Sequence, residues 1–150
     1  MRLTLAPVEM SSEPVPRAAA LVQGSARFTE KAAGTVTDSR TGLTWVMLDS
    51  RLAKGGCLTY TEALAYAKRL DTGGFRDWRL PTAEELKALL RSETGFPGSA
   101  ADWYWSKNSY RSYSGGWMTW VDVVGPGTSG APVQNRIEAA QCGWVRAVRP

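Results

Sequence analysis

Apolar residues after position 26 fall first into short strand-like runs separated by a polar turn. Residues 34–37 and 43–47 are rich in Thr, Val and Trp, and they flank the polar segment 38–42, which ends in glycine. Two such runs joined by a turn cluster are typical of a β-hairpin. The pattern therefore predicts two paired strands near the start of the domain.

Two helix starts follow, each marked by a threonine and a glutamate three positions apart. Thr59 with Glu62, and Thr82 with Glu85, have the form of a capping box, in which each side chain bonds the other residue's backbone N–H. Behind the first box, the apolar stripe at helical spacing consists of Tyr60, Ala63, Leu64 and Ala67. Behind the second, it consists of Leu86, Leu89 and Leu90. The sequence predicts two short amphipathic helices, the first ending at residue 70.

Aromatic and β-branched residues dominate the chain after position 98. Residues 103–106, 117–124 and 143–149 have this composition, which favours strands. The polar, glycine-rich segments between them, 107–116 and 125–141, predict long loops in the C-terminal half. Strands, then two helices, then strands again indicate an α+β fold in which two short helices pack on mainly antiparallel strands.

The first 24 residues differ from the rest of the chain. Residues 1–24 contain three of the eight prolines and show no sustained periodicity of apolar residues. They therefore predict an N-terminal arm or linker, in which residues 1–5 form an edge strand. A single domain at 25–150 accounts for the remainder. Proline and glutamate interrupt the apolar stretch that a signal peptide needs. The compartment stays open: cytoplasmic if Met1 is the native start, secreted or at the cell surface if an export signal has been removed.

The absence of histidine excludes several kinds of chemistry. Without His the chain cannot build a Ser-His-Asp or Cys-His nucleophile, imidazole acid–base catalysis, or His-ligated zinc or haem. Two cysteines are too few for a Cys₄ zinc site or a Cys-ligated iron–sulfur cluster. No glycine-rich phosphate-binding motif follows an apolar strand. We therefore expect no metal and no cofactor, and the composition favours binding over catalysis.

Carboxylate chemistry is the remaining enzymatic alternative. Glu84, Glu85 and Asp102 are the candidates for a pair that hydrolyses glycosides. Glu85 already belongs to a capping box, and Glu84 favours the same helix N-terminus. We interpret these residues as structural and expect that the protein is not an enzyme.

The charge of the chain favours anionic partners. The formal net charge is +4 and the isoelectric point about 9.3. Residues 1–102 hold 13 basic and 12 acidic side chains, a net of +1, whereas residues 103–150 hold 5 and 2, a net of +3. The arginine fork suits sulfate, carboxylate and phosphate groups. No Lys/Arg-rich run indicates specific nucleic-acid binding, and no apolar run approaches the roughly 18 residues of a membrane span.

Three ordered blocks of the sequence carry a family resemblance, over roughly residues 27–149. The first block comprises residues 27–28, 34–38 and 41–45. The second comprises residues 63–70, 77–82 and 85–86. The third comprises residues 104–106, a strand rich in tryptophan, and residues 144–149. These blocks resemble the Lcl C-terminal domain family, named for a collagen-like bacterial adhesin. The Asp-Trp-Arg-Leu-Pro-Thr run at 77–82 is also similar to one in formylglycine-generating enzymes and other domains with a C-type-lectin-like fold.

The resemblance implies a C-type-lectin-like fold and a compact, surface-displayed recognition module, which in the named adhesin is a trimer that binds sulfated glycans. It implies no activity. Formylglycine-generating enzymes use a closely spaced cysteine pair, whereas Cys57 and Cys142 lie 85 positions apart. The proline tripeptide of calcium-dependent lectins is missing, so calcium-mediated sugar binding is not expected.

The same resemblance bears on the two cysteines. Cys57 and Cys142 occupy positions resembling those joined by the main bridge of the lectin-like fold, which implies a disulfide if the protein is exported. Two buried, inert thiols are the alternative, and they suit a cytosolic protein better.

The run at 77–82 is explained by structure better than by function. Pro81 keeps the preceding residue out of the helical region, Thr82 caps the next helix, and Trp78 supplies core area. Asp77 and Arg79 then hold neighbouring loops. Of the seven tryptophans we expect most in the core and one or two at the rim of a site.

The segment 107–116 is the candidate binding loop. It combines Tyr, Ser, Asn, Gly and Arg, as antibody paratopes do, and its only charges are positive. A plain solvated loop is the alternative. The candidate ligand-binding residues are Lys107, Asn108, Tyr110, Arg111, Tyr113, Trp117 and Arg136.

These observations favour a non-enzymatic recognition or adhesion module that binds an anionic, possibly sulfated, glycan or a protein surface through its late loops. The first alternative is the variable protein of a diversity-generating retroelement, which displays a changeable protein-binding patch on a lectin-like fold. A structural subunit of a surface filament or oligomer is the second. A homo-oligomer, a trimer by the family resemblance, is consistent with each of them.

Overall fold

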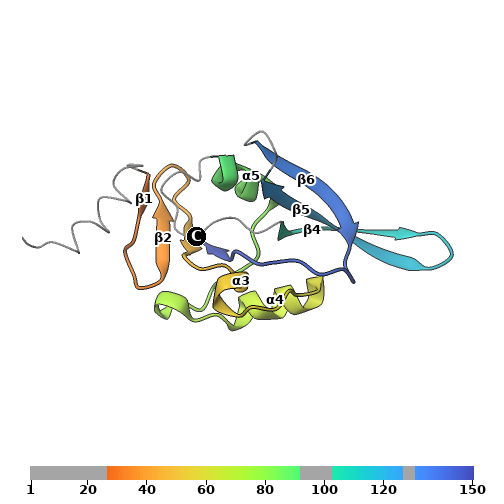
Figure 1. The fold of residues 1–150 in the computed structure, drawn as a ribbon, viewed down its shortest axis with the longest axis horizontal. Coiled ribbons are helices and arrows are strands. Elements are labelled where there is room, and N and C mark those ends of the chain that lie inside the picture. The colour runs from red at the N-terminus through yellow and green to blue at the C-terminus, as the bar shows by residue number, and fades with distance from the viewer. Residues whose placement is uncertain (1–26, 92–102, 127–130) are drawn as a thin grey trace, which may run out of the picture.

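The computed structural model describes residues 27–91, 103–126 and 131–150 (Figure 1). These residues form an α+β fold of two antiparallel sheets and a few short helices, as predicted. The predicted arm at 1–24, its edge strand and Asp102 lie outside the described residues.

The first sheet has the strand order β1-β2-β3-β7. Its strands are β1 (Phe28–Thr29), β2 (Thr35–Asp38), β3 (Thr44–Val46) and β7 (Val148–Arg149). The hairpin predicted from the sequence is confirmed: β2 pairs with β3, and Val36 lies opposite Trp45. All three pairings in this sheet are antiparallel.

The predicted strand at 143–149 is wrong over most of its length, because only β7 at its end pairs in the sheet. Successive residues before β7 bond to different neighbours. Gly143 exchanges backbone hydrogen bonds of 2.8 Å with Leu58, and the Val145 N–H donates to the Ser50 hydroxyl at 2.8 Å. The apolar alternation there reflects burial between elements, not a ladder.

The second sheet has the order β4-β5-β6, with β4 at Tyr104–Tyr113, β5 at Trp117–Pro126 and β6 at Pro132–Glu138. Two predictions are corrected here. The supposed loop at 107–116 is mostly β4, and the supposed loop at 125–141 contains β6. Both segments are polar because their strands lie largely exposed, so no buried face imposes an apolar alternation.

In the described parts of the chain, four short helices connect the sheets. They are α3 (Ser50–Ala53), α4 (Tyr60–Arg69), the 3₁₀ turn η2 (Thr72–Gly74) and α5 (Ala83–Arg91). α4 and α5 are the two predicted helices, whereas α3 and η2 are too short to show a period. Leu64 is wrongly placed in the buried stripe of α4: it is 39% exposed, whereas the buried residues of this helix are Tyr60, Ala63 and Ala67.

Two apolar clusters form the core, one on each side of the second sheet. The cluster beside α4 consists of Val46, Leu58, Tyr60, Ala63, Ala67, Trp78, Leu80, Trp105, Val121, Val123, Val145 and Ala147. The cluster beside α5 consists of Phe28, Val36, Trp45, Ala83, Leu86, Leu89, Leu90, Tyr104, Val124 and Val148. Figure 1 shows α4 and α5 on opposite sides of β4 and β5. The expectation that Trp78 is a core residue is confirmed.

A buried polar triad ties the clusters together. Asp49 caps α3 by accepting from the Leu52 N–H, and it also accepts a 2.6 Å hydrogen bond from the Tyr104 hydroxyl. Arg146 donates to the same carboxylate at 3.5 Å and to the Tyr104 hydroxyl at 3.2 Å. All three side chains are buried, and Arg146 also donates to the Val46 and Met47 carbonyls, so the polar groups of the triad are hydrogen-bonded away from water.

The structure joins Cys57 and Cys142 by a disulfide, with 5.5 Å between their Cα atoms. Beside it, Leu58 and Gly143 form an antiparallel bridge. The cross-link therefore fixes the loop before α4 to the segment that leads into the last strand.

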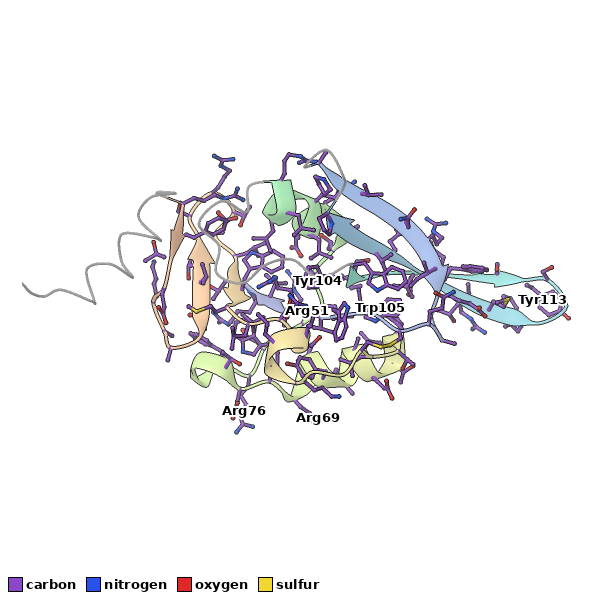
Figure 2. All side chains as sticks on the ribbon, viewed as in Figure 1. Arg51, Arg69, Arg76, Tyr104, Trp105 and Tyr113 are labelled. Carbon is purple, nitrogen blue, oxygen red and sulfur yellow. A yellow bond between two sulfur atoms is a disulfide. The ribbon has the colours of Figure 1, made fainter. Side chains whose placement is uncertain are left out.

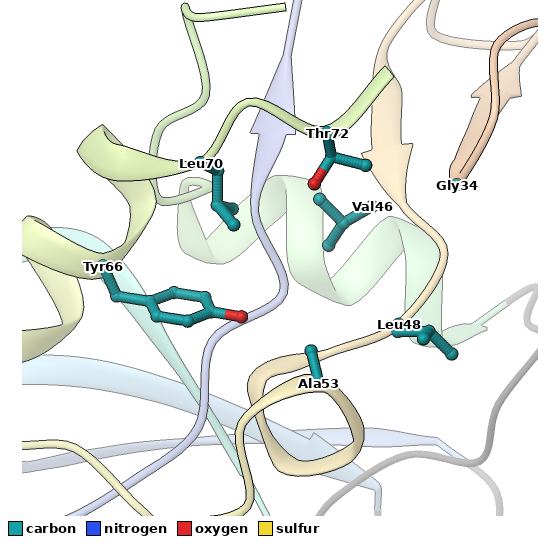
Figure 3. Close-up of a pocket in the computed structure, with 7 residues that line it drawn as sticks. All are labelled: Gly34, Val46, Leu48, Ala53, Tyr66, Leu70 and Thr72. Atoms are coloured by element: carbon teal, nitrogen blue, oxygen red, sulfur yellow. The ribbon is translucent and has the colours of Figure 1, made fainter. Parts of the chain in front are cut away.

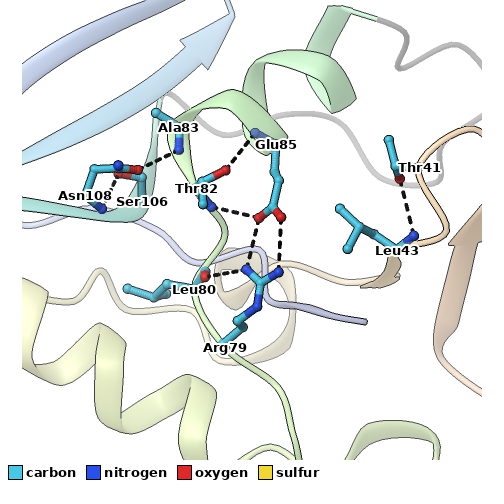
Figure 4. Close-up of polar contacts among 9 residues, drawn as sticks. All are labelled: Thr41, Leu43, Arg79, Leu80, Thr82, Ala83, Glu85, Ser106 and Asn108. Carbon is cyan, nitrogen blue, oxygen red and sulfur yellow. Dashed lines mark hydrogen bonds and ion pairs between the residues drawn. The ribbon is translucent and has the colours of Figure 1, made fainter.

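The run at 77–82 has the structural role that the sequence indicated (Figure 4). Thr82 and Glu85 form the capping box, with the Thr82 N–H donating to Glu85 Oε1 at 2.8 Å and the Glu85 N–H to Thr82 Oγ1 at 3.1 Å. The Arg79 guanidinium donates to both Glu85 oxygens, at 2.9 and 3.0 Å. Asp77 pairs with Arg149 at 2.6 Å. Asp77, Arg79 and Glu85 therefore each form an ion pair that stabilises the fold.

Thr82→Ala should lower the free energy of unfolding by about 1 kcal/mol, because it removes the side-chain acceptor at the start of α5. Urea unfolding followed by tryptophan fluorescence measures the loss. Thr61→Ala, an exposed position in the first turn of α4, is the matched control and should change stability little. Equal losses at the two positions would contradict the capping role.

Glu85 should make stability depend on pH. Burial alone would raise its pKa, but hydrogen bonds from Arg79 and from the Thr82 backbone lower the pKa below its ordinary value of 4.5. Its contribution is therefore present above that value and lost as the pH falls through the lowered pKa. The stability difference between wild type and Glu85→Gln, measured in urea titrations, should be constant near neutral pH and shrink as the pH falls below 4.5 and through the lowered pKa. A stability difference that does not change with pH would contradict this role of the Glu85 carboxylate.

Candidate functional site

The β4–β5 hairpin extends beyond the body of the protein (Figure 1). β6 pairs with β5 from Pro126 as far as Trp120, which lies opposite Glu138. Beyond this pair the hairpin continues as two strands, and we call residues 111–119 the hairpin arm. Its turn is closed by a 3.0 Å hydrogen bond from the Ser114 N–H to the Gly116 carbonyl.

A bulge anchors the base of the arm. The β4–β5 register shifts between Trp105 and Ser109. Within the bulge, Asn108 Oδ1 accepts a 2.9 Å hydrogen bond from the Ala83 N–H, and the Lys107 N–H donates to the Pro81 carbonyl at 2.7 Å (Figure 4). Asn108, a predicted ligand residue, therefore supports the start of α5. Lys107 lies at the base of the arm with its side chain exposed.

Three of the predicted ligand residues gather on one face of the arm. Tyr113 lies opposite Trp117 and Arg111 opposite Thr119, so all four side chains share a face. The Arg111 guanidinium lies over the Trp117 ring, 4.7 Å from its centroid. The Tyr113 ring packs edge-on against the same indole, with 5.4 Å between the ring centroids. We call Arg111, Tyr113 and Trp117 the tip cluster.

The tip cluster is open to solvent. Tyr113 is 66% exposed and Trp117 is 65% exposed, and Tyr113 lies near the far end of the arm (Figure 2). The tryptophans that the sequence could not sort are now separated: Trp45, Trp78 and Trp105 are buried in the body, whereas Trp117 is at the tip. Large aromatic side chains exposed together are unusual on a soluble domain and mark contact surfaces.

The remaining predicted residues, Tyr110 and Arg136, lie on the opposite face. The Tyr110 hydroxyl donates to Asp122 Oδ2 at 2.8 Å, and Arg136 Nε donates to Asp122 Oδ1 at 3.0 Å. The Arg136 guanidinium also lies 3.7 Å from the centroid of the Tyr110 ring. The Asp122 carboxylate raises the pKa of both groups, because it accepts a hydrogen bond from each protonated form. Arg136 is thus neutralised by Asp122.

The two faces of the arm consequently differ in charge. Within the described part of the chain, no carboxylate forms an ion pair with Arg111 or Lys107. The first acidic residue after Lys107 is Asp122 itself, on the other face. The tip cluster therefore offers an uncompensated guanidinium on one side of the Trp117 ring, which also contacts Tyr113.

Asp122 is the residue of this region that sequence reasoning missed. It was counted only as a charge, although its position five residues after Trp117 places it on the face opposite Trp117 once a strand is assumed. That alternation separates Arg111 from Arg136, which the sequence had grouped as joint ligand contacts.

No group of histidine, cysteine or carboxylate residues within 27–91, 103–126 and 131–150 is suited to hold a metal ion. None of the helices in these ranges has the length and apolar character needed to cross a membrane.

Comparison with known proteins identifies one family. The model of the Lcl C-terminal domain matches residues 34–149, which include every strand after β1 and all the helices described above. No curated protein and no solved structure matches the chain.

Proposed function

Because the chain belongs to the Lcl C-terminal domain family, we propose that it is a non-enzymatic recognition module that binds an anionic glycan through its tip cluster. The observation that carries this proposal is the exposed Arg111–Trp117–Tyr113 cluster on a projecting arm. The same proposal includes a C-type-lectin-like fold, supported by two antiparallel sheets, two principal helices and a disulfide that joins the loop before α4 to the segment leading into the last strand.

The chemistry of the tip cluster suits a charged sugar. An exposed indole offers an apolar face to the C–H groups of a sugar ring, and Tyr113 widens that platform with a hydroxyl at its edge. Arg111 supplies a fork that bonds two oxygens of a sulfate or carboxylate at once. Since Trp117 contacts both neighbours, the three groups are held in place before a ligand arrives, which lowers the ordering cost of binding.

Arg111→Ser and Trp117→Ala should each weaken binding to a sulfated glycan such as heparin about tenfold, since each removes an interaction of roughly 1.4 kcal/mol. Calorimetric titration measures the affinities, and binding should weaken as salt rises. Arg40→Ser, an exposed arginine in the β2–β3 turn, removes the same charge elsewhere and should leave the affinity within twofold. Arg136→Ser should also have a small effect, because Asp122 already compensates that charge.

Equal losses at Arg40 and Arg111 would mean that net charge alone attracts the glycan. Loss at Arg136 without loss at Arg111 would move the site to the opposite face. No salt-sensitive binding to any anionic glycan would favour the second candidate, a protein ligand.

A protein ligand is favoured by the composition of β4. Ser109, Tyr110, Ser112 and Tyr113 alternate along an exposed strand, in the manner of a paratope that combines rigid tyrosines with small polar contacts. The variable protein of a diversity-generating retroelement belongs to this class. Sequencing sibling copies from one genome tests it: substitutions concentrated at adenine-containing codons of 107–120 would support it, and a uniform sequence there would exclude it.

A further inference from the structure

A small apolar pocket lies far from the arm, where α3, α4 and the first sheet meet (Figure 3). Its volume is about 130 Å³, and its walls are mostly aliphatic, with Val46, Ala53 and Leu70 among them. Leu48, on its rim, is 51% exposed. A closed apolar cavity of roughly 150 Å³ accepts benzene, and this pocket, slightly smaller but open at the rim beside Leu48, is close to the size of one such group.

Tyr66 brings a polar atom into this apolar pocket. Figure 3 shows the ring entering from α4 with its hydroxyl directed toward the centre of the pocket. Among the described residues nothing forms a hydrogen bond with this hydroxyl. Burial, together with the nearby Asp49 carboxylate, raises the pKa of Tyr66, so the hydroxyl keeps its proton at neutral pH. It is an unused donor.

A second hollow, of about 390 Å³, shares Tyr66 as a wall. Two cations line it, Lys54 at the end of α3 and Arg69 at the end of α4. Neither forms an ion pair with any residue that the structure describes. One carboxylate, Glu62, also lines the hollow and accepts the Thr59 N–H at 2.9 Å, so the two cations still leave an excess of positive charge there.

The apolar pocket, the unused hydroxyl and the unpaired cations therefore follow one another along the seam between α3 and α4. We propose that this seam binds a small monocarboxylate that carries one benzene-sized apolar group. The apolar group occupies the pocket lined by Val46 and Leu70. The carboxylate passes Tyr66, accepts its hydrogen bond, and is neutralised by Lys54 and Arg69. This site is independent of the tip cluster and of the function proposed for it.

The test compares three probes in calorimetric or NMR titrations, up to about 20 mM: 3-phenylpropanoate, the neutral 3-phenylpropan-1-ol, and acetate. The first should bind at least threefold more tightly than the alcohol, and acetate should show no saturation at this site. We expect a weak dissociation constant, near 1 mM, for a ligand of this size. This dissociation constant corresponds to a binding free energy of about −4.1 kcal/mol.

Three variants locate the site. The double variant Lys54→Ser with Arg69→Ser should lower the affinity for 3-phenylpropanoate at least threefold, to that of the alcohol, and Tyr66→Phe should weaken it about twofold. Ala53→Trp, at an exposed position beside the pocket, should block both aromatic probes. The control Lys68→Ser removes an exposed cation of α4 that lines neither hollow and should change nothing.

Equal affinity for the carboxylate and the alcohol, or loss of binding in Lys68→Ser as large as in the double variant, would overturn the proposed charge recognition. Absence of saturable binding by all three probes would overturn the site itself. Trp117→Ala should leave these titrations unchanged, so the outcome is separate from that of the glycan experiment.

Discussion

Replacing Arg146 by Met should lower the free energy of unfolding by about 3–5 kcal/mol, the loss expected when one partner of a buried ion pair is removed. The reason is Asp49, whose buried carboxylate would lose its cationic partner. The Tyr104 hydroxyl donates to Asp49 and would lose the hydrogen bond that it accepts from Arg146. Chemical denaturation at neutral pH measures the change.

Arg149→Met is the matched control for this prediction. Arg149 also pairs with an aspartate, but that partner, Asp77, is half exposed and remains hydrated when the arginine is lost. The control should therefore be much less destabilising than Arg146→Met. If both variants lose the same stability, or if Arg146→Met folds as stably as wild type, the buried triad does not hold the two clusters together.

Trp78→Ala should cost about 3–5 kcal/mol, because it empties a site in the cluster beside α4. Trp78 is buried, its ring meets Phe75 edge-on at 6.4 Å, and its Nε1–H donates to the Thr72 carbonyl at 3.2 Å. Thermal and urea unfolding measure the loss. The variant also removes the hydrogen bond between Trp78 and η2.

Trp117→Ala is the control with the same change of side chain at the tip. Since Trp117 is mostly exposed, its loss should change stability by no more than about 0.5 kcal/mol. The two substitutions should thus separate completely: one reduces stability, and the other reduces ligand binding in a fully folded protein. A stability loss at Trp117 comparable to that at Trp78 would mean that the arm is part of the folded core.

The sequence predicted those elements whose signals are local. The capping boxes at Thr59 and Thr82 depend on residues three positions apart, and both are present in the structure. The β2–β3 hairpin was likewise evident from two strands and the turn between them. In each case the residues that determine the element lie within it, so the chain can be interpreted without knowing what packs against it.

The late strands were harder to predict, because their exposure depends on the rest of the molecule. β4 continues past the edge of the core, so residues 107–113 lack the apolar alternation by which strands are identified. Residues 143–147 have that alternation, but they are buried between elements and form no continuous ladder. The pattern of apolar residues indicates which residues are buried. In this half of the chain, the buried residues and the residues paired in strands are not the same.

The same distinction limited the candidate site. Arg111, Tyr113 and Trp117 were named from composition, and the structure brings them together. Asn108 and Arg136 were named on the same grounds, but one supports α5 and the other pairs with Asp122. Composition indicates which residues are able to contact a ligand, whereas only the strand register determines which of them share a face.

The order of strands in the first sheet has a consequence for how the protein acquires its fold. β3 pairs with β7, and the partners Thr44 and Arg149 are more than one hundred positions apart in the chain. A growing polypeptide can close the β2–β3 hairpin early, but β3 keeps one unpaired edge until residue 149 has been synthesised. Such long-range pairing slows folding, since a large loop must close before the contact forms. We therefore expect the first sheet to be completed only after residues 148–149 have been synthesised.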